Sequence, residues 1–253
     1  MDNVKSKTGE TTLAVDLSEA TDAVKQGNFD HALSLLKFIL QDDPEHLDGL
    51  YLSAVSSRYL KNFEDSDNYL KRLLTVAPDM GRAYQELGHL NRDLGKEEQA
   101  VTHYRQACEL NPALIASWNY LFQYFVKHKN KPAAEHAELQ IKKLNSLPAN
   151  LLYIDQILNE GRLGMAESKC RAFLKENPTH TYAMSLLAEI ANRMGYFDDA
   201  EFLLQKAVEF SPNDGELRLK YASVLRKKQK FVQTMEQVNI CLLYTSDAAD
   251  EVQ

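Results

Sequence analysis

The chain is poor in the residues and segments that mark several protein classes. Its 253 residues include only three cysteines, Cys108, Cys170 and Cys241, which lie far apart and form no C-x-x-C pair. Such a set supports neither a disulfide framework nor a zinc site, and we expect small buried thiols. No apolar run approaches the ~20 residues of a membrane helix, and the first residues lack a signal-peptide core. These absences predict a cytoplasmic protein with no membrane partner.

An excess of basic residues is also missing. The chain has 29 Lys and Arg against 36 Asp and Glu, which gives a formal net charge of −7. Because nucleic-acid phosphates require a basic face, we expect no nucleic-acid partner. Catalytic and metal motifs are absent too: there is no phosphate-binding G-x-x-x-x-G-K-[ST] loop, no G-x-S-x-G elbow and no H-x-x-x-H pair. The sequence therefore predicts no catalytic residue, no metal site, no cofactor and no enzyme activity for this chain.

The few prolines are regularly spaced. Pro44, Pro78 and Pro112 follow one another at intervals of 34 residues, and Pro178 and Pro212 do the same. The 66 residues from Pro112 to Pro178 equal 34 plus 32, so a further unit two residues short lies between them. When the proline is set at position 32 of each unit, seven units are predicted to begin near residues 13, 47, 81, 115, 147, 181 and 215.

Small residues recur in phase with these prolines. Position 8 holds Ala20, Ala54, Gly88, Phe122, Ile154, Ala188 and Ala222, and position 20 holds Ala32, Ser66, Ala100, Ala134, Ala166, Ala200 and Thr234. Apolar residues around them follow helical spacing, which predicts two helices in each unit. Small residues at positions 8 and 20 allow the two helix axes to approach closely. Phe122, Ile154 and Thr234 depart from this pattern.

Residues at two positions of each unit predict where the chain turns after each helix. Glycine stands at position 15 in four units (Gly27, Gly95, Gly161 and Gly195), where it suits the left-handed residue that ends a helix. Proline at position 32 cannot continue the second helix and directs the chain into the next unit.

The third unit, GRAYQELGHLNRDLGKEEQAVTHYRQACELNP, resembles the tetratricopeptide repeat, and the resemblance extends over residues 13–240. It implies an all-α fold, a right-handed α-α superhelix (a TPR solenoid) of about seven helix-turn-helix repeats. It further implies a protein–protein interaction scaffold that binds a protein or an extended peptide in a concave groove.

In that family, positions 2, 5, 9 and 12 of the first helix face the groove. Carried over to this chain, they give the candidate contacts Tyr51, Arg58, Arg82, Gln85, His89, Arg92, Asn119 and Gln123. Arginine and amide side chains bind carboxylates and peptide backbone. The resulting groove is locally basic within an acidic chain, which predicts an acidic or C-terminal peptide. The other interpretation, that these are merely solvated polar residues, stays open.

A narrower resemblance covers residues 80–231, including ILNEGRLGMAESKCRAFLKENPTH. This stretch is similar to the repeat region of bacterial proteins in which tetratricopeptide repeats precede a sulfotransferase domain. That resemblance implies an alternative function, the non-catalytic, substrate-presenting front part of a truncated sulfotransferase.

The two ends depart from the repeat. Residues 1–12 are polar and aperiodic, so we expect a disordered segment. Residues 241–253 are expected to form a separate tail, because CLLYTSDAADE resembles one reading frame of a transposon-end sequencing adapter. The other interpretation of this segment is a natural C-terminal helix. The seventh repeat is then expected to lack a solvating cap, and its exposed face to associate with a second molecule.

Overall fold

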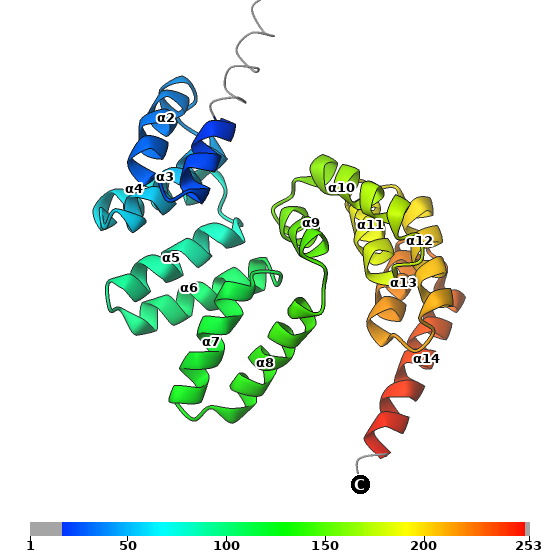
Figure 1. Ribbon diagram of the computed structural model, residues 1–253. Helices are drawn as coiled ribbons and strands as arrows, with labels where there is room; N and C mark the ends of the chain where they lie inside the picture. Colours follow the sequence, from blue (N-terminus) through cyan, green and yellow to red (C-terminus); the bar gives the residue numbers. More distant parts are fainter. Residues whose placement is uncertain (1–16, 251–253) are drawn as a thin grey trace, which may run out of the picture. The chain divides into compact units, whose positions relative to one another are not determined.

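The computed structural model describes residues 17–250 of the chain, and the side chains of residues 17–241. All regular structure in this part is helical, without a strand (Figure 1). After a helical segment at residues 17–25, the helices are α2 (Phe29–Asp42), α3 (Leu47–Tyr59), α4 (Phe63–Val76), α5 (Gly81–Asp93), α6 (Glu97–Leu110), α7 (Ile115–Lys127), α8 (Lys131–Asn145), α9 (Ala149–Asn159), α10 (Leu163–Glu176), α11 (Thr181–Arg193), α12 (Phe197–Phe210), α13 (Gly215–Lys227) and α14 (Phe231–Asp250). The predicted all-α fold of stacked helix-turn-helix repeats is confirmed.

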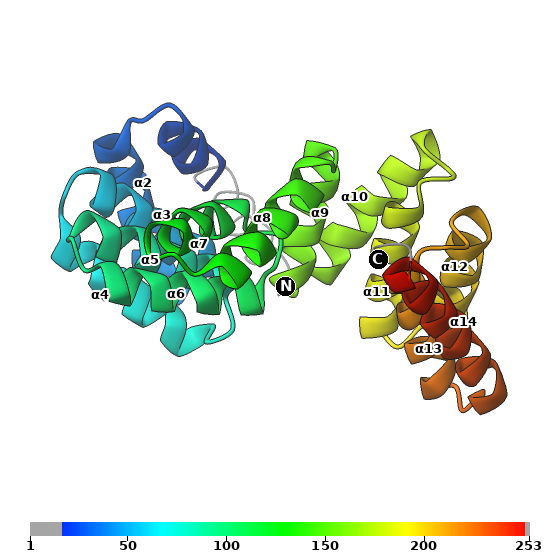
Figure 2. The same cartoon turned by 90° about the horizontal axis from the view of Figure 1, so that it is seen from below.

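The chain divides into two compact units, of which the first ends at Ser146 and the second begins at Leu147. Within each unit, consecutive helices pack as antiparallel pairs (Figures 1 and 2). The helices α3, α5, α7, α11 and α13 start at residues 47, 81, 115, 181 and 215, where the proline spacing placed five of the repeats. In the shortened repeat, Pro148 precedes the first helical residue of α9, which begins two residues later than position 1.

The two helices of a repeat approach closely at the predicted small residues. Ala32, Ser66, Ala100, Ala166 and Ala200, all at position 20, have no exposed surface. Gly88 at position 8 lies on the ring of Tyr104: a methyl group built on Gly88 would come within 2.7 Å of a ring carbon. Tyr104 is itself completely buried. A larger residue at position 8 would therefore have to displace a side chain that fills the core of this repeat.

The fourth repeat has a bulky residue at position 8 and packs differently. Its Phe122, the bulky residue at position 8, is only half-buried. Leu121 and Phe125, one position before it and three after it, are the buried residues on this face of α7. Phe122 packs against the edge of this core cluster from its half-buried position, and Ala134 stays buried on α8.

Every turn within a repeat has the same backbone geometry at position 15. Gly27, Gly95, Gly161 and Gly195 have φ between 72° and 84°, as the sequence predicts. The other three repeats place Lys61, Lys129 and Gln229 at this position, with φ of 64°, 56° and 59°. In each turn, the backbone N–H of the following residue donates to the carbonyl five residues earlier, for example Lys96 to Asn91 at 2.8 Å. This bond belongs to the Schellman motif, which satisfies a carbonyl at the helix end.

The structure describes only part of the two predicted end segments. The expected disordered segment, residues 1–12, lies outside the described residues. Cys241, the first residue of the expected adapter-derived tail, is buried at position 27 of the seventh repeat, and α14 continues to Asp250. The origin of the tail remains a prediction, and its side chains after Cys241 lie outside the described part. No helix in the described part is long and apolar enough to span a lipid bilayer.

A residue exchange at position 15 tests this turn. Lys129→Gly should stabilise the protein by about 0.5–1 kcal/mol, because lysine is strained at positive φ and glycine is not. The reverse change, Gly95→Lys, should destabilise by a similar amount, since a Cβ at Gly95 meets nothing within 4 Å and the cost is conformational. Urea denaturation of both variants measures the effect, and shifts of the same sign would contradict this account of the turn.

Candidate functional site

The candidate contact residues all lie on α3, α5 and α7, the first helices of three successive repeats in the first unit. Within this unit α3 contacts α5 and α5 contacts α7, so the three helices form one layer. Ser117 of α7 donates a hydrogen bond of 3.0 Å to the side-chain oxygen of Gln85 on α5. The structure thus brings the predicted positions to one continuous face, and their partners on that face decide what each can bind.

Arg58 joins α3 to α5 through ion pairs. Its guanidinium is 7% exposed and binds Glu86 at 2.5 Å and Asp93 at 2.8 Å. Burial raises the pKa of Glu86, and the adjacent Arg58 partly offsets this rise. Removing one partner of such a buried pair leaves a charge without compensation, which typically costs about 3–5 kcal/mol. Arg58 is therefore a link between repeats, with little surface left for a ligand.

Arg82 is also engaged within the layer. Its guanidinium forms an ion pair with Asp48 of α3 and lies 4.4 Å from the ring centre of Tyr51. Both charged side chains are mostly buried. Tyr51 and Arg82, two of the candidate contacts, thus form a cation–π pair with each other. A ligand at this point would contact the edge of the cluster that Asp48, Tyr51 and Arg82 form.

His89 is joined to the core of its own repeat. Its Nδ1 lies 2.6 Å from the hydroxyl of Tyr104 on α6, and the two rings meet edge to face. Burial lowers the pKa of His89 to about 4, and the nearby charges of Arg58 and Arg92 add to this effect. His89 is therefore neutral at physiological pH, and the hydrogen bond between its Nδ1 and the Tyr104 hydroxyl joins α5 to α6.

Arg92 is the most exposed arginine of the set, with 45% of its side chain accessible. It binds one oxygen of Asp93 at 2.8 Å, while Arg58 binds the other. Burial alone would raise the pKa of Asp93, but the hydrogen bonds from Arg92 and Arg58 outweigh it and lower that pKa. Each of the three arginines thus has a carboxylate partner. These partners lower the net positive charge of the face, and the binding role of its residues stays a prediction.

The residues on α7 differ from those on α3 and α5. Asn119 and Gln123, the two candidate contacts there, are exposed. The other two groove positions of the same helix, Ala116 and Val126, are exposed as well. Exposure of the groove positions therefore increases from the second repeat to the fourth. The part of the face open to a partner is α7 with the adjoining edge of α5.

The cysteines and other titratable groups offer no further chemistry on this face. Cys108, Cys170 and Cys241 are free thiols and are all buried. Burial raises the pKa of Cys108 and that of Cys170 to about 12, which leaves both thiols protonated and unreactive. Across the described residues, no group of three or more His, Cys, Asp or Glu side chains is arranged to hold a metal ion.

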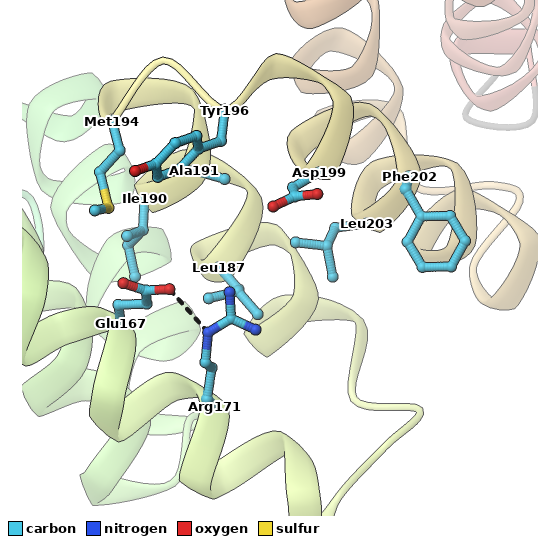
Figure 3. Close-up of a pocket in the computed structure, with 10 residues that line it drawn as sticks. All are labelled: Glu167, Arg171, Leu187, Ile190, Ala191, Met194, Tyr196, Asp199, Phe202 and Leu203. Carbon is cyan, nitrogen blue, oxygen red and sulfur yellow. Dashed lines mark hydrogen bonds and ion pairs between the residues drawn. The ribbon is translucent and has the colours of Figure 1, made fainter.

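Sequence reasoning missed a pocket in the second unit. It lies over α11 between α10 and α12 and has a volume of about 220 Å³ (Figure 3). Its residues carry no motif, because they come from two successive repeats and meet only through packing. Only a comparison of equivalent positions in neighbouring repeats could have indicated it.

The pKa of His89 makes a prediction about stability and pH. Because the folded state holds this pKa near 4, against 6.5 for an ordinary histidine, the unfolded chain binds the proton first as pH falls. The contribution of neutral His89 is complete above pH 6.5 and is lost progressively towards pH 4. In urea denaturation across this range, His89→Gln should flatten the pH dependence, leaving the parts due to other shifted groups such as His103, whose pKa burial lowers, and Glu86, whose pKa burial raises. An unchanged slope in the variant would contradict the assignment.

Comparison with known proteins agrees with the repeat assignment. Sequence models of the tetratricopeptide repeat match residues 81–114 and 182–214, and another matches residues 17–66. The segments 81–114 and 182–214 coincide with the third and sixth predicted repeats. Human tetratricopeptide repeat protein 21B is 22% identical over 226 residues, which are 85% of this chain and 14% of that protein. The chain thus spans 14% of the length of this curated relative.

The chain also matches solved structures, at low identity and with TM-scores below 0.5. A tetratricopeptide repeat protein from Parabacteroides merdae has 14% identity and a TM-score of 0.45, with 92% of this chain and 99% of that chain covered. Pseudomonas aeruginosa pilF has 12% identity and a TM-score of 0.41, with 95% and 98% covered. None of these matches bears on the sulfotransferase resemblance, which stays a prediction. The chain contains tetratricopeptide repeats, a fold typical of non-catalytic scaffolds for protein–protein interaction.

Proposed function

We propose that the face formed by α7 and the adjoining edge of α5 binds an extended segment of a partner protein. The observation that carries this proposal is the exposure of all four groove positions on α7, in contrast to the engaged positions on α3. Repeat proteins use such layers of parallel helices as extended binding surfaces. The chain acts in this proposal as a scaffold, with no chemical step of its own.

The two exposed amides give the surface its chemistry. Asn119 and Gln123 are four residues apart on α7, so their side chains lie on the same side of the helix. Each amide offers both a donor and an acceptor, which matches the N–H and C=O groups of an extended peptide backbone. Gln85 of α5, held by Ser117, continues this row of amides.

Arg92 determines which charge this surface prefers in the partner segment. It is the exposed arginine of the face, and its hydrogen bonds to Asp93 come from Nε and one of the two Nη groups. An acidic side chain or a C-terminal carboxylate of the partner would bind here as a second anion. Since Arg58 and Arg82 already have carboxylate partners, one acidic group is the expected requirement, and a long acidic segment is not.

A peptide selected on the full chain tests this function. A phage-displayed library of 12-residue peptides supplies a binder, and its affinity is measured by fluorescence anisotropy. The Asn119→Ala, Gln123→Ala double variant should bind about ten- to one-hundredfold more weakly, because two hydrogen bonds of about 1 kcal/mol each are lost. Gln140→Ala, on the second helix of the same repeat, is the matched control and should bind as the wild type does. Equal affinity of the double variant and the wild type would reject the α7 surface.

A further inference from the structure

The pocket of the second unit has an apolar floor and charged walls. Leu187, Ile190 and Ala191 of α11 form the floor and are buried, while the walls come from α10 and α12 (Figure 3). Tyr196, at the turn between α11 and α12, borders the opening and is 57% exposed. We name this site the junction pocket, because it lies where the fifth repeat meets the sixth.

The equivalent place one repeat later has two lysines of the chain bound to a glutamate. Where the sixth repeat meets the seventh, Glu201 of α12 accepts hydrogen bonds from Lys228 and Lys230, the latter at 2.6 Å. Lys228 also pairs with Asp198. These lysines stand at positions 14 and 16 of the seventh repeat, and Glu201 stands at position 21 of the sixth. A glutamate of one repeat thus receives two cations from the next.

At the junction pocket, the glutamate is kept but the two lysines are absent. Glu167 occupies position 21 of the fifth repeat, whereas positions 14 and 16 of the sixth hold Met194 and Tyr196. Position 18, which is Asp198 in the sixth repeat, is Gly164 in the fifth, and a Cβ there would meet nothing within 4 Å. Met194 and Tyr196 therefore line the pocket at the two positions from which lysines bind the glutamate one repeat further along the chain.

The charges around this space favour a cation. Glu167 and Asp199 border it from α10 and α12, and Arg171 is the one basic residue of its lining (Figure 3). Arg171 donates to Glu167 at 2.8 Å along the exposed side of α10. Among the described residues, Asp199 forms no ion pair and no side-chain hydrogen bond. Two carboxylates and one guanidinium leave the pocket with a net charge of −1.

We propose that the junction pocket binds an arginine or lysine side chain of a partner protein. The aliphatic part of that side chain would cover the floor of α11, and its cation would lie between Glu167 and Asp199, against the ring of Tyr196. The site lies on the second unit, on different helices from the α7 surface, and does not depend on the function proposed for that surface.

Binding of a minimal probe to the full chain tests the proposal. Nα-acetyl-argininamide is titrated into protein labelled with ¹³C at the methionine methyl groups, and the Met194 signal is followed by NMR. The signal should shift with the arginine probe and stay in place with the citrulline analogue, which has the same shape without the charge. A Met194 shift of equal size with citrulline, or no shift with arginine, would overturn the proposal.

Variants of the wall residues identify the charges involved. Asp199→Asn and Glu167→Gln should each weaken binding about two- to fivefold, as expected for partly exposed ion pairs. Arg171→Gln should strengthen it, because it removes the cation that competes for Glu167. Asp198→Asn is the matched control, since it makes the same charge change one residue away, where Lys228 is the partner. Wild-type affinity in Asp199→Asn would mean that this carboxylate only stabilises the start of α12, and would reject the proposed site.

Discussion

The close approach of the two helices in each repeat is the constraint on which the rest of the structure depends. In the third repeat, the backbone of α5 at Gly88 lies directly against the ring of Tyr104, with no room for a larger side chain. The alanines and the serine at position 20 meet the same requirement on the second helix in six repeats. Because the two helices of a repeat lie so close together, part of their apolar surface faces the neighbouring repeat. Stacking of the repeats buries this surface. The layer of first helices, and with it the α7 surface, follows from that stacking.

Much of the architecture follows from spacing that is visible in the sequence. Five helices begin at the residue that the proline interval gives, because proline must stand just beyond the end of a helix. The positive φ of Lys61, Lys129 and Gln229 could not be predicted from residue type, since these residues seldom adopt it. There the Schellman hydrogen bonds and the packing of the hairpin override the local preference. Phe122 likewise stays only half-buried at the edge of the core, because Leu121 and Phe125 are the buried residues on this face of α7.

The candidate site was predictable only in part, for a physical reason. Helical periodicity places Arg58, Arg82 and Arg92 on one face, but it does not predict which carboxylates bind their guanidinium groups. The carboxylates that bind Arg58 are 28 and 35 residues away along the chain, and packing brings them together. The lysines that bind Glu201 lie 27 and 29 residues away in the same manner. Charge compensation between repeats thus decides which parts of the surface are available, and it leaves Arg92 as the most exposed arginine of the predicted contacts.

The two glycines Gly88 and Gly164 allow the central claim to be measured most directly. Both lie within helices, and a methyl group built on Gly164 meets nothing within 4 Å, whereas on Gly88 it meets the Tyr104 ring. Chemical denaturation should show that Gly88→Ala destabilises the protein by about 1–3 kcal/mol through overpacking. Gly164→Ala should stabilise it by about 0.5–1 kcal/mol, the ordinary effect of alanine in a helix. A stabilising Gly88→Ala would contradict the account, because the helices would then not depend on a small residue at this crossing.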